Sequence, residues 1–333
     1  MSELLPVAVI GCGRMGRLHA RVYSQMPSVK LVGVFDANAE AAKETAEDYG
    51  TAALSMEEIL SQAKAVTIAV PTTYHLSTAE PFLKRGIACL IEKPLAPTSA
   101  DARKLVELAA AGNAALQVGH IERFNPAVRS MLQLHIVPGF LEVTRISPLS
   151  FRSTDVGVVL DMMIHDIDIV LQLANSKVTK IDATGVSVIG EAEDVCNARL
   201  KFANGCVANL TASRLSMKTE RRLRAFSSDT YVSLDYQKKY GIAIRKSGNV
   251  EKVRDVIAKI RSGEIEDLSD LNYTELVDVQ ELEISDVEPL RAELDAFVDA
   301  AQGKSKPVVS GEDGLAAVEL AERIVAEMEK MAV

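Results

Sequence analysis

Hydrophobic and polar positions in the first 120 residues alternate between two periods. Short apolar runs rich in β-branched residues predict strands at 6–10, 30–36, 65–70, 87–92 and 115–119. Apolar residues recur at helical spacing between these runs, which predicts helices at 14–26, 38–50, 74–86 and 98–112. Strands that alternate with helices of this length indicate βαβ units, so we expect an α/β domain with a parallel sheet.

The pattern changes after about residue 120. The helices predicted there cover 124–135, 157–173, 251–261, 287–302 and 311–331. The predicted strands cover 140–147 and most of 178–245, with turn signals such as Asn204–Gly205 between them. We therefore expect two domains, an α/β domain at 1–120 and an α+β domain with an antiparallel sheet at 121–333.

Composition narrows the classes of protein. The 333 residues are 48% hydrophobic and 25% charged, and the net charge is −9 with no long basic run. A nucleic-acid partner is not expected, because phosphate neutralisation requires clustered Lys and Arg. The apolar run near the N-terminus is too short for a signal peptide or a membrane span, so we expect a cytoplasmic protein without a membrane partner. The cysteines lack metal-ligand spacing and are expected as free thiols; they are Cys12, Cys89, Cys196 and Cys206.

A glycine-rich turn follows the first predicted strand. Gly11, Gly13 and Gly16 form G-x-G-x-x-G at the start of a helix, a context typical of dinucleotide binding. Gly11 permits the tight turn, Gly13 lets the backbone approach a pyrophosphate, and Gly16 lets the helix pack on the strand. A plain glycine-rich turn is the alternative. The other expected cofactor contacts within this turn are Cys12, Arg14 and Met15.

An acidic residue ends the second predicted strand. Asp36 lies 20 residues after Gly16, where a carboxylate accepts hydrogen bonds from both ribose hydroxyls of NAD and repels the 2′-phosphate of NADP. Ala37 and Asn38 follow, so no arginine stands beside Asp36 to hold that phosphate. The cofactor is therefore predicted to be NAD, with an ordinary turn residue as the alternative role for Asp36.

The turn after the strand at 87–92 has the sequence Glu92-Lys93-Pro94. Open α/β sheets bind ligands at the carboxyl ends of their strands, and Lys93 stands there. A lysine beside a bound nicotinamide could polarise a substrate hydroxyl. Taken on the residues alone, a solvated loop lysine is the simpler reading.

The predicted helix at 157–173 is apolar almost all round, yet it carries Asp161, His165, Asp166 and Asp168. Helical spacing places Asp161, His165 and Asp168 on one face and Asp166 elsewhere. A carboxylate buried without a partner costs several kcal/mol. We therefore expect this polar face to meet a ligand, with a satisfied histidine–aspartate pair in the core as the alternative.

Four segments together resemble the glucose–fructose oxidoreductase and inositol dehydrogenase family, Gfo/Idh/MocA. They are VAVIGCGRMG, TIAVPTTYH, CLIEKP and VVLDMMIHDIDIV, in that order. The resemblance implies an N-terminal Rossmann doubly wound parallel sheet and a C-terminal α+β domain with a large, mainly antiparallel sheet. That sheet often serves oligomerisation, so we expect a homodimer or homotetramer formed through it.

The resemblance also implies an NAD-dependent oxidoreductase that acts on a sugar or cyclitol hydroxyl. Lys93, Asp161 and His165 match the family's catalytic positions. His165 would accept the hydroxyl proton, Asp161 would orient the imidazole, and Lys93 would act through its charge. No metal is implied, and the histidines show no joint metal spacing; His19 and His135 are expected as packing or surface residues.

Some positions depart from the family pattern. Met163 stands where a glycine is frequent, and Ile121 and Glu122 replace an asparagine and an arginine. With these departures, VGHIERFNPAV and DVGVVLDMMIHDIDIVL resemble a branch that oxidises the C3 hydroxyl of UDP-N-acetylglucosamine to a ketone. That reaction is our expectation. The alternatives are a dehydrogenase of a free sugar or inositol, and a sensor that binds NAD and a sugar without turnover.

The remaining expected contacts follow from these motifs. The other cofactor contacts are Val70, Pro71, Thr72, His75, Glu92, Lys93 and His120. The substrate contacts are Lys93, Arg123, Asn125, Arg152, Asp155 and His165. Arg222 and Arg224 could also hold a diphosphate, although a solvated or subunit-facing sheet surface explains them more simply.

Overall fold

The structure, a computed structural model, describes residues 4–149, 156–189, 191–246, 250–264 and 277–331. Its contacts group the chain into two units. The first unit consists of Met1–Asn125, Val159–Ile169 and Val287–Val333, and the second of Pro126–Val158 and Val170–Asp286. The expected division into 1–120 and 121–333 is therefore too simple, because two later segments of the chain return to the first unit.

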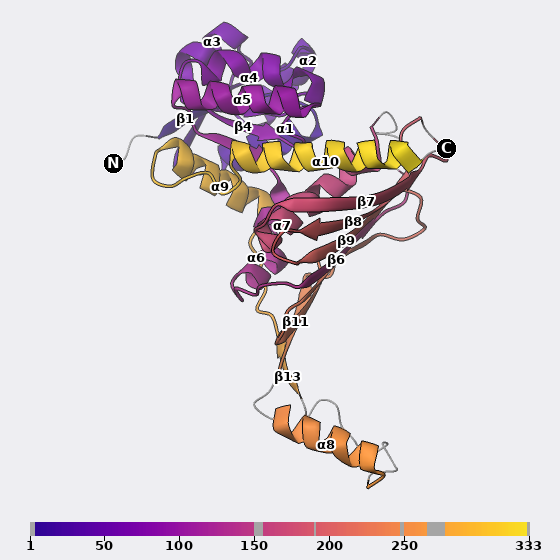
Figure 1. Cartoon of the computed structure of the whole chain (residues 1–333). Coiled ribbons are helices and arrows are strands. Elements are labelled where there is room, and N and C mark those ends of the chain that lie inside the picture. Colours follow the sequence, from indigo (N-terminus) through magenta and orange to yellow (C-terminus); the bar gives the residue numbers. More distant parts are fainter. Residues whose placement is uncertain (1–3, 150–155, 190, 247–249, 265–276, 332–333) are drawn as a thin grey trace. The chain divides into compact units, whose positions relative to one another are not determined.

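The first unit is built on a parallel sheet with the strand order β2-β1-β3-β4-β5. The strands are β1 (Leu5–Ile10), β2 (Val29–Phe35), β3 (Ala65–Ile68), β4 (Ala88–Glu92) and β5 (Leu116–Gly119). Helices lie around these strands (Figure 1). They are α1 (Arg14–Ser24), α2 (Ala39–Asp48), α3 (Met56–Gln62), α4 (His75–Leu83) and α5 (Ser99–Gly112). Strands β3, β4 and β5 are buried along their whole length, which explains their continuous apolar runs.

Two helices late in the chain complete the first unit. They are α9 (Pro289–Ala301) and α10 (Gly311–Met331), and α10 packs against α5. Leu290, Leu294 and Phe297 of α9 belong to the same buried cluster as Val9 of β1 and Tyr23 of α1. The core around the parallel sheet is therefore closed by residues far away in the sequence.

The second unit contains an eight-stranded sheet with the order β13-β12-β11-β10-β6-β9-β8-β7. Neighbouring strands are antiparallel except for β6 and β9, which confirms the mainly antiparallel sheet. The strands are β6 (Phe140–Ile146), β7 (Val178–Val186), β8 (Val195–Phe202), β9 (Val207–Ser213), β10 (Glu220–Phe226), β11 (Thr230–Asp235), β12 (Tyr240–Lys246) and β13 (Val277–Glu281). The helices include α6 (Pro126–Leu132) and α8 (Val250–Ser262).

The predicted helix at 157–173 is wound in two ways. Residues Val159–Met163 form a π-helix, η3, and Ile164–Ala174 continue as the α-helix α7. The carbonyl oxygen of Asp161, within the π-helix, accepts a hydrogen bond from the Lys93 side chain. Single π turns within helices occur frequently at functional sites, and this one carries a predicted catalytic residue.

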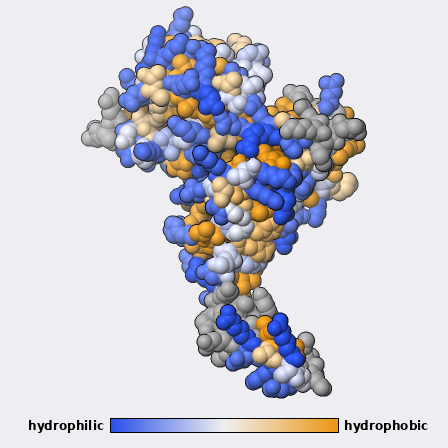
Figure 2. Space-filling model, viewed as in Figure 1, coloured by the Kyte–Doolittle hydropathy of each residue, from blue (hydrophilic) through white to orange (hydrophobic). Residues whose placement is uncertain are grey.

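The surface view in Figure 2 shows hydrophilic and hydrophobic residues interspersed. Within the described residues, none of the helices has the length and hydropathy of a membrane-spanning segment.

Candidate active site

The glycine-rich turn has the close contacts that its three glycines predict. Gly11 has a φ of +95°, and a Cβ there would lie 2.5 Å from the carbonyl oxygen of Ala69. A Cβ on Gly16 would lie 1.7 Å from the carbonyl oxygen of Gly11, so only glycine lets α1 approach β1. A Cβ on Gly13 would meet nothing within 4 Å. The backbone before α1 is therefore open to a ligand, and the first N–H groups of the helix suit a pyrophosphate.

Asp36 lies beside this turn. Its Oδ2 accepts a hydrogen bond of 2.6 Å from the backbone N–H of Cys12, and its Oδ1 accepts one of 2.8 Å from that of Asn38. These bonds fix the carboxylate at the end of β2, and each oxygen keeps a lone pair for a ribose hydroxyl. The turn and Asp36 together therefore fit the pyrophosphate and the adenosine ribose of a dinucleotide.

Lys93 and the 157–173 segment converge, as predicted. The Nζ of Lys93 donates to the carbonyl oxygen of Asp161 at 2.7 Å and lies 3.3 Å from its Oδ1. The side chains of Lys93 and Asp161 are 21% and 31% exposed, so solvent still reaches the pair. The sequence predicts that Asp161 orients His165, whereas the structure places its carboxylate against Lys93.

His165 lies next to a second histidine. The rings of His120 and His165 are edge to face, with centroids 6.3 Å apart. His120 is fully buried, and its two ring nitrogens have no hydrogen-bond partner among the described residues. Burial lowers the pKa of His120 below that of an exposed histidine; nearby Asp168 opposes this, and Arg123 and Lys93 reinforce it. His120 is therefore neutral at physiological pH.

Arg123 is held inside the protein. Its Nε and one terminal nitrogen donate to the carboxylate of Asp168 at 2.6 and 2.8 Å. The side chains are 5% and 1% exposed, and Asp313 lies 3.7 Å from the guanidinium. The sequence places Asp168 on a ligand-facing stripe and Arg123 against substrate. In the structure they form a buried ion pair between η2 (Ile121–Phe124) and α7.

His75 holds the turn that carries Lys93. Its Nε2 lies 3.0 Å from the carbonyl oxygen of Val70, and its Nδ1 lies 3.1 and 3.2 Å from those of Pro94 and Leu95. Burial lowers the pKa of His75, although these carbonyls partly oppose the shift. Its ring nitrogens thus face backbone rather than a ligand, and His75 fixes Lys93 indirectly.

The structure places the remaining predicted contact residues in different surroundings. Asn125, predicted to touch the sugar, donates a 3.0 Å hydrogen bond to the buried Glu122. Pro71 is exposed and Thr72 half-buried in the turn after β3, where their cofactor contacts stay predictions. Arg152 and Asp155 lie outside the described residues. On the sheet of the second unit, Arg222 and Arg224 pair with carboxylates; their partners are Glu220 and Glu142, respectively.

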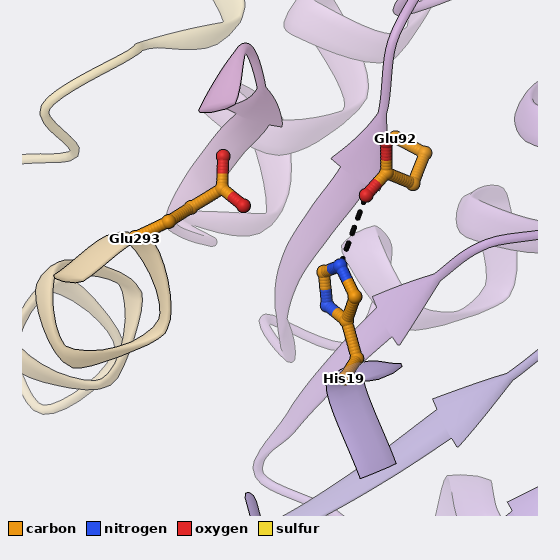
Figure 3. A group of neighbouring side chains, drawn as sticks. All are labelled: His19, Glu92 and Glu293. Carbon is orange, nitrogen blue, oxygen red and sulfur yellow. Dashed lines mark hydrogen bonds and ion pairs between the residues drawn. The ribbon is translucent and has the colours of Figure 1, made fainter. Parts of the chain in front are cut away.

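A buried cluster beneath the lysine turn was not predicted. Nε2 of His19 lies 2.9 Å from Oε1 of Glu92, and Glu293 of α9 completes the group (Figure 3). Ligand-type atoms of these three residues all lie within 4.8 Å of one another. The helical period contained the signal, because His19 and Glu293 fall on the apolar faces of α1 and α9. Glu92, predicted to contact the cofactor, points into this cluster.

Two family models match the chain. The model of the GFO/IDH/MocA oxidoreductase family with an NAD-binding Rossmann fold matches residues 5–120. The model of the GFO/IDH/MocA C-terminal domain matches residues 143–232.

Individual proteins show the same similarity. The UDP-N-acetylglucosamine 3-dehydrogenase of Acidithiobacillus ferrooxidans is 38% identical over 230 residues, which cover 68% of this chain and 73% of that protein. A solved structure of the enzyme with that name and from that organism superposes with a TM-score of 0.87 at 30% identity and covers 98% of both chains. The inositol 2-dehydrogenase of Rhizobium meliloti is 26% identical over 98% of both chains.

Proposed function

The chain belongs to the GFO/IDH/MocA oxidoreductase family, and from this premise we propose that it oxidises a hydroxyl of a nucleotide sugar to a ketone with NAD. The observation that carries the proposal is the contact between the side chain of Lys93 and Asp161. Asp161 lies four residues before His165 in the same helical segment. A lysine and a histidine beside a dinucleotide turn suit the removal of a proton from an alcohol.

The side chains divide this chemistry among them. His165 accepts the proton of the substrate hydroxyl through an imidazole nitrogen. The ammonium group of Lys93 stabilises the negative charge that develops on that oxygen, and Asp161 holds the ammonium group in place. NAD, when bound, supplies the acceptor for the hydride that leaves the carbon atom bearing this hydroxyl.

NAD rather than NADP is the proposed cofactor. The carboxylate of Asp36 is fixed by the backbone of Cys12 and Asn38, so it cannot turn away from a 2′-phosphate without losing two hydrogen bonds. Repulsion of that phosphate disfavours NADP. Reaction rates measured with each cofactor at equal concentration test this preference.

UDP-N-acetylglucosamine, oxidised at C3, is the proposed substrate. The support is the 38% identical 3-dehydrogenase of that nucleotide sugar, together with the departures from the family pattern at Ile121, Glu122 and Met163. The inositol 2-dehydrogenase from Rhizobium meliloti, at 26% identity, makes a free cyclitol the second candidate.

A substrate panel tests the proposal. Purified protein is incubated with NAD and, separately, UDP-N-acetylglucosamine, UDP-glucose, glucose and myo-inositol, and NADH formation is followed by absorbance. We expect NADH with UDP-N-acetylglucosamine, and a product that mass spectrometry shows to lack two hydrogen atoms. NADH formed only with inositol would replace the nucleotide sugar by a cyclitol, and no NADH with any sugar would favour a sensor.

A further inference from the structure

The buried cluster of His19, Glu92 and Glu293 joins three distant parts of the first unit. His19 comes from α1, Glu92 from the end of β4 and Glu293 from α9, and their side chains point toward one another in Figure 3. His19 and Glu293 are fully buried, and Glu92 is 9% exposed. Two carboxyl groups therefore share one space that water hardly reaches.

Two anions cannot be stabilised in this space by the groups around it. Glu92 accepts hydrogen bonds from His19 and, at 3.3 Å, from the backbone N–H of Lys93. Neither carboxyl oxygen of Glu293 has a hydrogen-bond partner among the described residues. An isolated buried carboxylate takes up a proton instead of paying the cost of desolvation.

The charged and titratable groups facing the cluster support this assignment. Glu293 faces Glu92 and His19, and it interacts electrostatically with Tyr23 of α1. Burial and the charge of Glu92 raise the pKa of Glu293 well above its usual range. Burial also raises the pKa of Glu92, but the hydrogen bond and charge of His19 and the charge of Lys93 outweigh it, so the pKa is lowered overall. Glu92 also interacts electrostatically with His75 and His120.

We propose that Glu293 is a neutral carboxylic acid that lets Glu92 stay ionised, and that the ionised Glu92 positions Lys93. Gly119 of the neighbouring strand leaves room for this carboxyl group, since an added Cβ there would lie 3.1 Å from the Cδ and Oε2 atoms of Glu92. It holds the backbone N–H of Lys93, whose side chain reaches Asp161. Glu92 and Glu293 are thus positioning residues, and their catalytic consequence rests on the proposed function.

A proton on Glu293 explains how the two carboxyl groups lie together better than a bound metal ion does. Nε2 of His19 and Oε1 of Glu92 already bond to each other at 2.9 Å, so their lone pairs do not face a common centre. A bound cation would require both groups to turn away from that bond.

The first experiment replaces Glu293 by glutamine, which mimics a neutral carboxylic acid. Midpoint temperatures of unfolding (Tm) are measured at pH 5 and pH 8 for wild type, Glu293→Gln and the exposed control Glu107→Gln. The unfolded chain loses the Glu293 proton above about pH 4.3 while the folded chain keeps it, so wild-type stability falls as pH rises. We expect the Tm of Glu293→Gln to gain about 2–4 °C relative to wild type between pH 5 and pH 8.

Two results would overturn the neutral assignment. One is a lower Tm of Glu293→Gln at pH 8, which would mean that the folded chain uses an ionised Glu293. The other is a divalent metal, present at one equivalent in purified wild type, whose removal by a chelator lowers the Tm. Neither measurement needs a substrate, so both remain decisive if the proposed function fails.

The second experiment tests positioning with Glu92→Gln. Loss of the anion should release Lys93, so reductive methylation of its amine, measured by mass spectrometry, should become severalfold faster than in wild type. When a substrate that wild type turns over is assayed, the kcat of Glu92→Gln should be about tenfold or more below that of wild type, while KM changes little. An unchanged methylation rate would show that Glu92 does not position Lys93, whether or not a substrate is known.

Discussion

Lys93 is the residue on which the proposed chemistry depends most. The half-buried side chain of Lys93 has the carbonyl oxygen and a carboxylate oxygen of Asp161 as partners, and these two contacts fix the position of its amine. His75 binds the carbonyls of Pro94 and Leu95 just beyond it. The amine is therefore held ready before any substrate arrives.

Removing either reacting side chain should abolish most turnover. We expect Lys93→Met and His165→Ala each to lower kcat/KM by about 10²- to 10⁴-fold, because each removes a proton-handling or charge-stabilising group. Initial rates of NADH formation measure the effect. Lys43→Met removes an exposed charge and serves as the control. Values within a few-fold of wild type for both variants would exclude this scheme.

Buried neutral histidines should make the fold sensitive to acid. Burial lowers the pKa of His120 and of His75, so the folded chain resists protonation where the unfolded chain accepts it. Their contribution to stability is present above about pH 6.5 and is lost as the pH falls toward the lowered pKa of the folded state.

Urea unfolding between pH 7.5 and 5 measures this loss. His120→Asn should flatten the pH dependence by up to about 1.4 kcal/mol per pH unit. His135→Asn, which changes an exposed histidine, is the control variant. An equal slope in wild type and His120→Asn would mean that His120 titrates alike in both states.

At the scale of elements, η2 and α7 are joined by the buried pair of Arg123 and Asp168. Asp168→Asn should lower the free energy of unfolding by about 3 kcal/mol, because it removes the buried charge partner of the guanidinium and leaves it only the half-exposed Asp313 at 3.7 Å. The double variant Arg123→Met/Asp168→Leu should lose less than the single variant, because it buries no charge. Urea titration measures both. If the double variant loses as much stability as Asp168→Asn or more, the pair does not act as a unit.

The sequence predicted elements where the pattern was long and missed them where it was short. The seven-residue helix α3 was not predicted, because it is too short to show a clear apolar period. Its capping box of Ser55 and Glu58 does indicate the start of a helix. Strand β13 (Val277–Glu281) and the π-helix at Val159–Met163 were also not predicted. β13 pairs with β12, and the π-helix contacts Lys93, and both contacts exist only in the folded chain.

The sequence predicted the positions of several residues of the candidate site but not which of them pair with one another. Motif spacing located the glycine turn and Asp36, and the resemblance to the family implied that Lys93 and Asp161 lie together. It could not assign partners: Arg123 binds Asp168, and Asp161 binds Lys93, because a pairing depends on tertiary geometry. Helical periodicity alone could have placed Glu293 in the core.

At the scale of the whole molecule, the sheet of the second unit presents an apolar row. Directly paired residues on six adjacent strands share this row and are half-buried or exposed. They are Val207, Phe140, Phe226, Tyr231, Ile244 and Val279. The rings of Phe140 and Tyr231 lie 5.6 and 4.8 Å from that of Phe226. Such a row favours burial against another surface.

We propose that this row contributes to a homodimer or homotetramer. Phe226→Glu places a charge at its centre and should shift the assembly toward monomer, as measured by light scattering coupled to size-exclusion chromatography. Lys43→Glu, at an exposed position on α2 outside this sheet, is the charge-reversal control and should have less effect. A monomeric wild type would remove the proposal.

The return of the last helices to the first unit has a consequence for biosynthesis. Leu290, Leu294 and Phe297 fill the core around β1 and α1, yet the ribosome adds them after the parallel sheet and the whole second unit have been made. The nascent nucleotide-binding region must therefore emerge with part of its apolar interior uncovered. Its final consolidation must therefore wait until residues 287–301 have been synthesised, and chaperones can act on the uncovered interior before then.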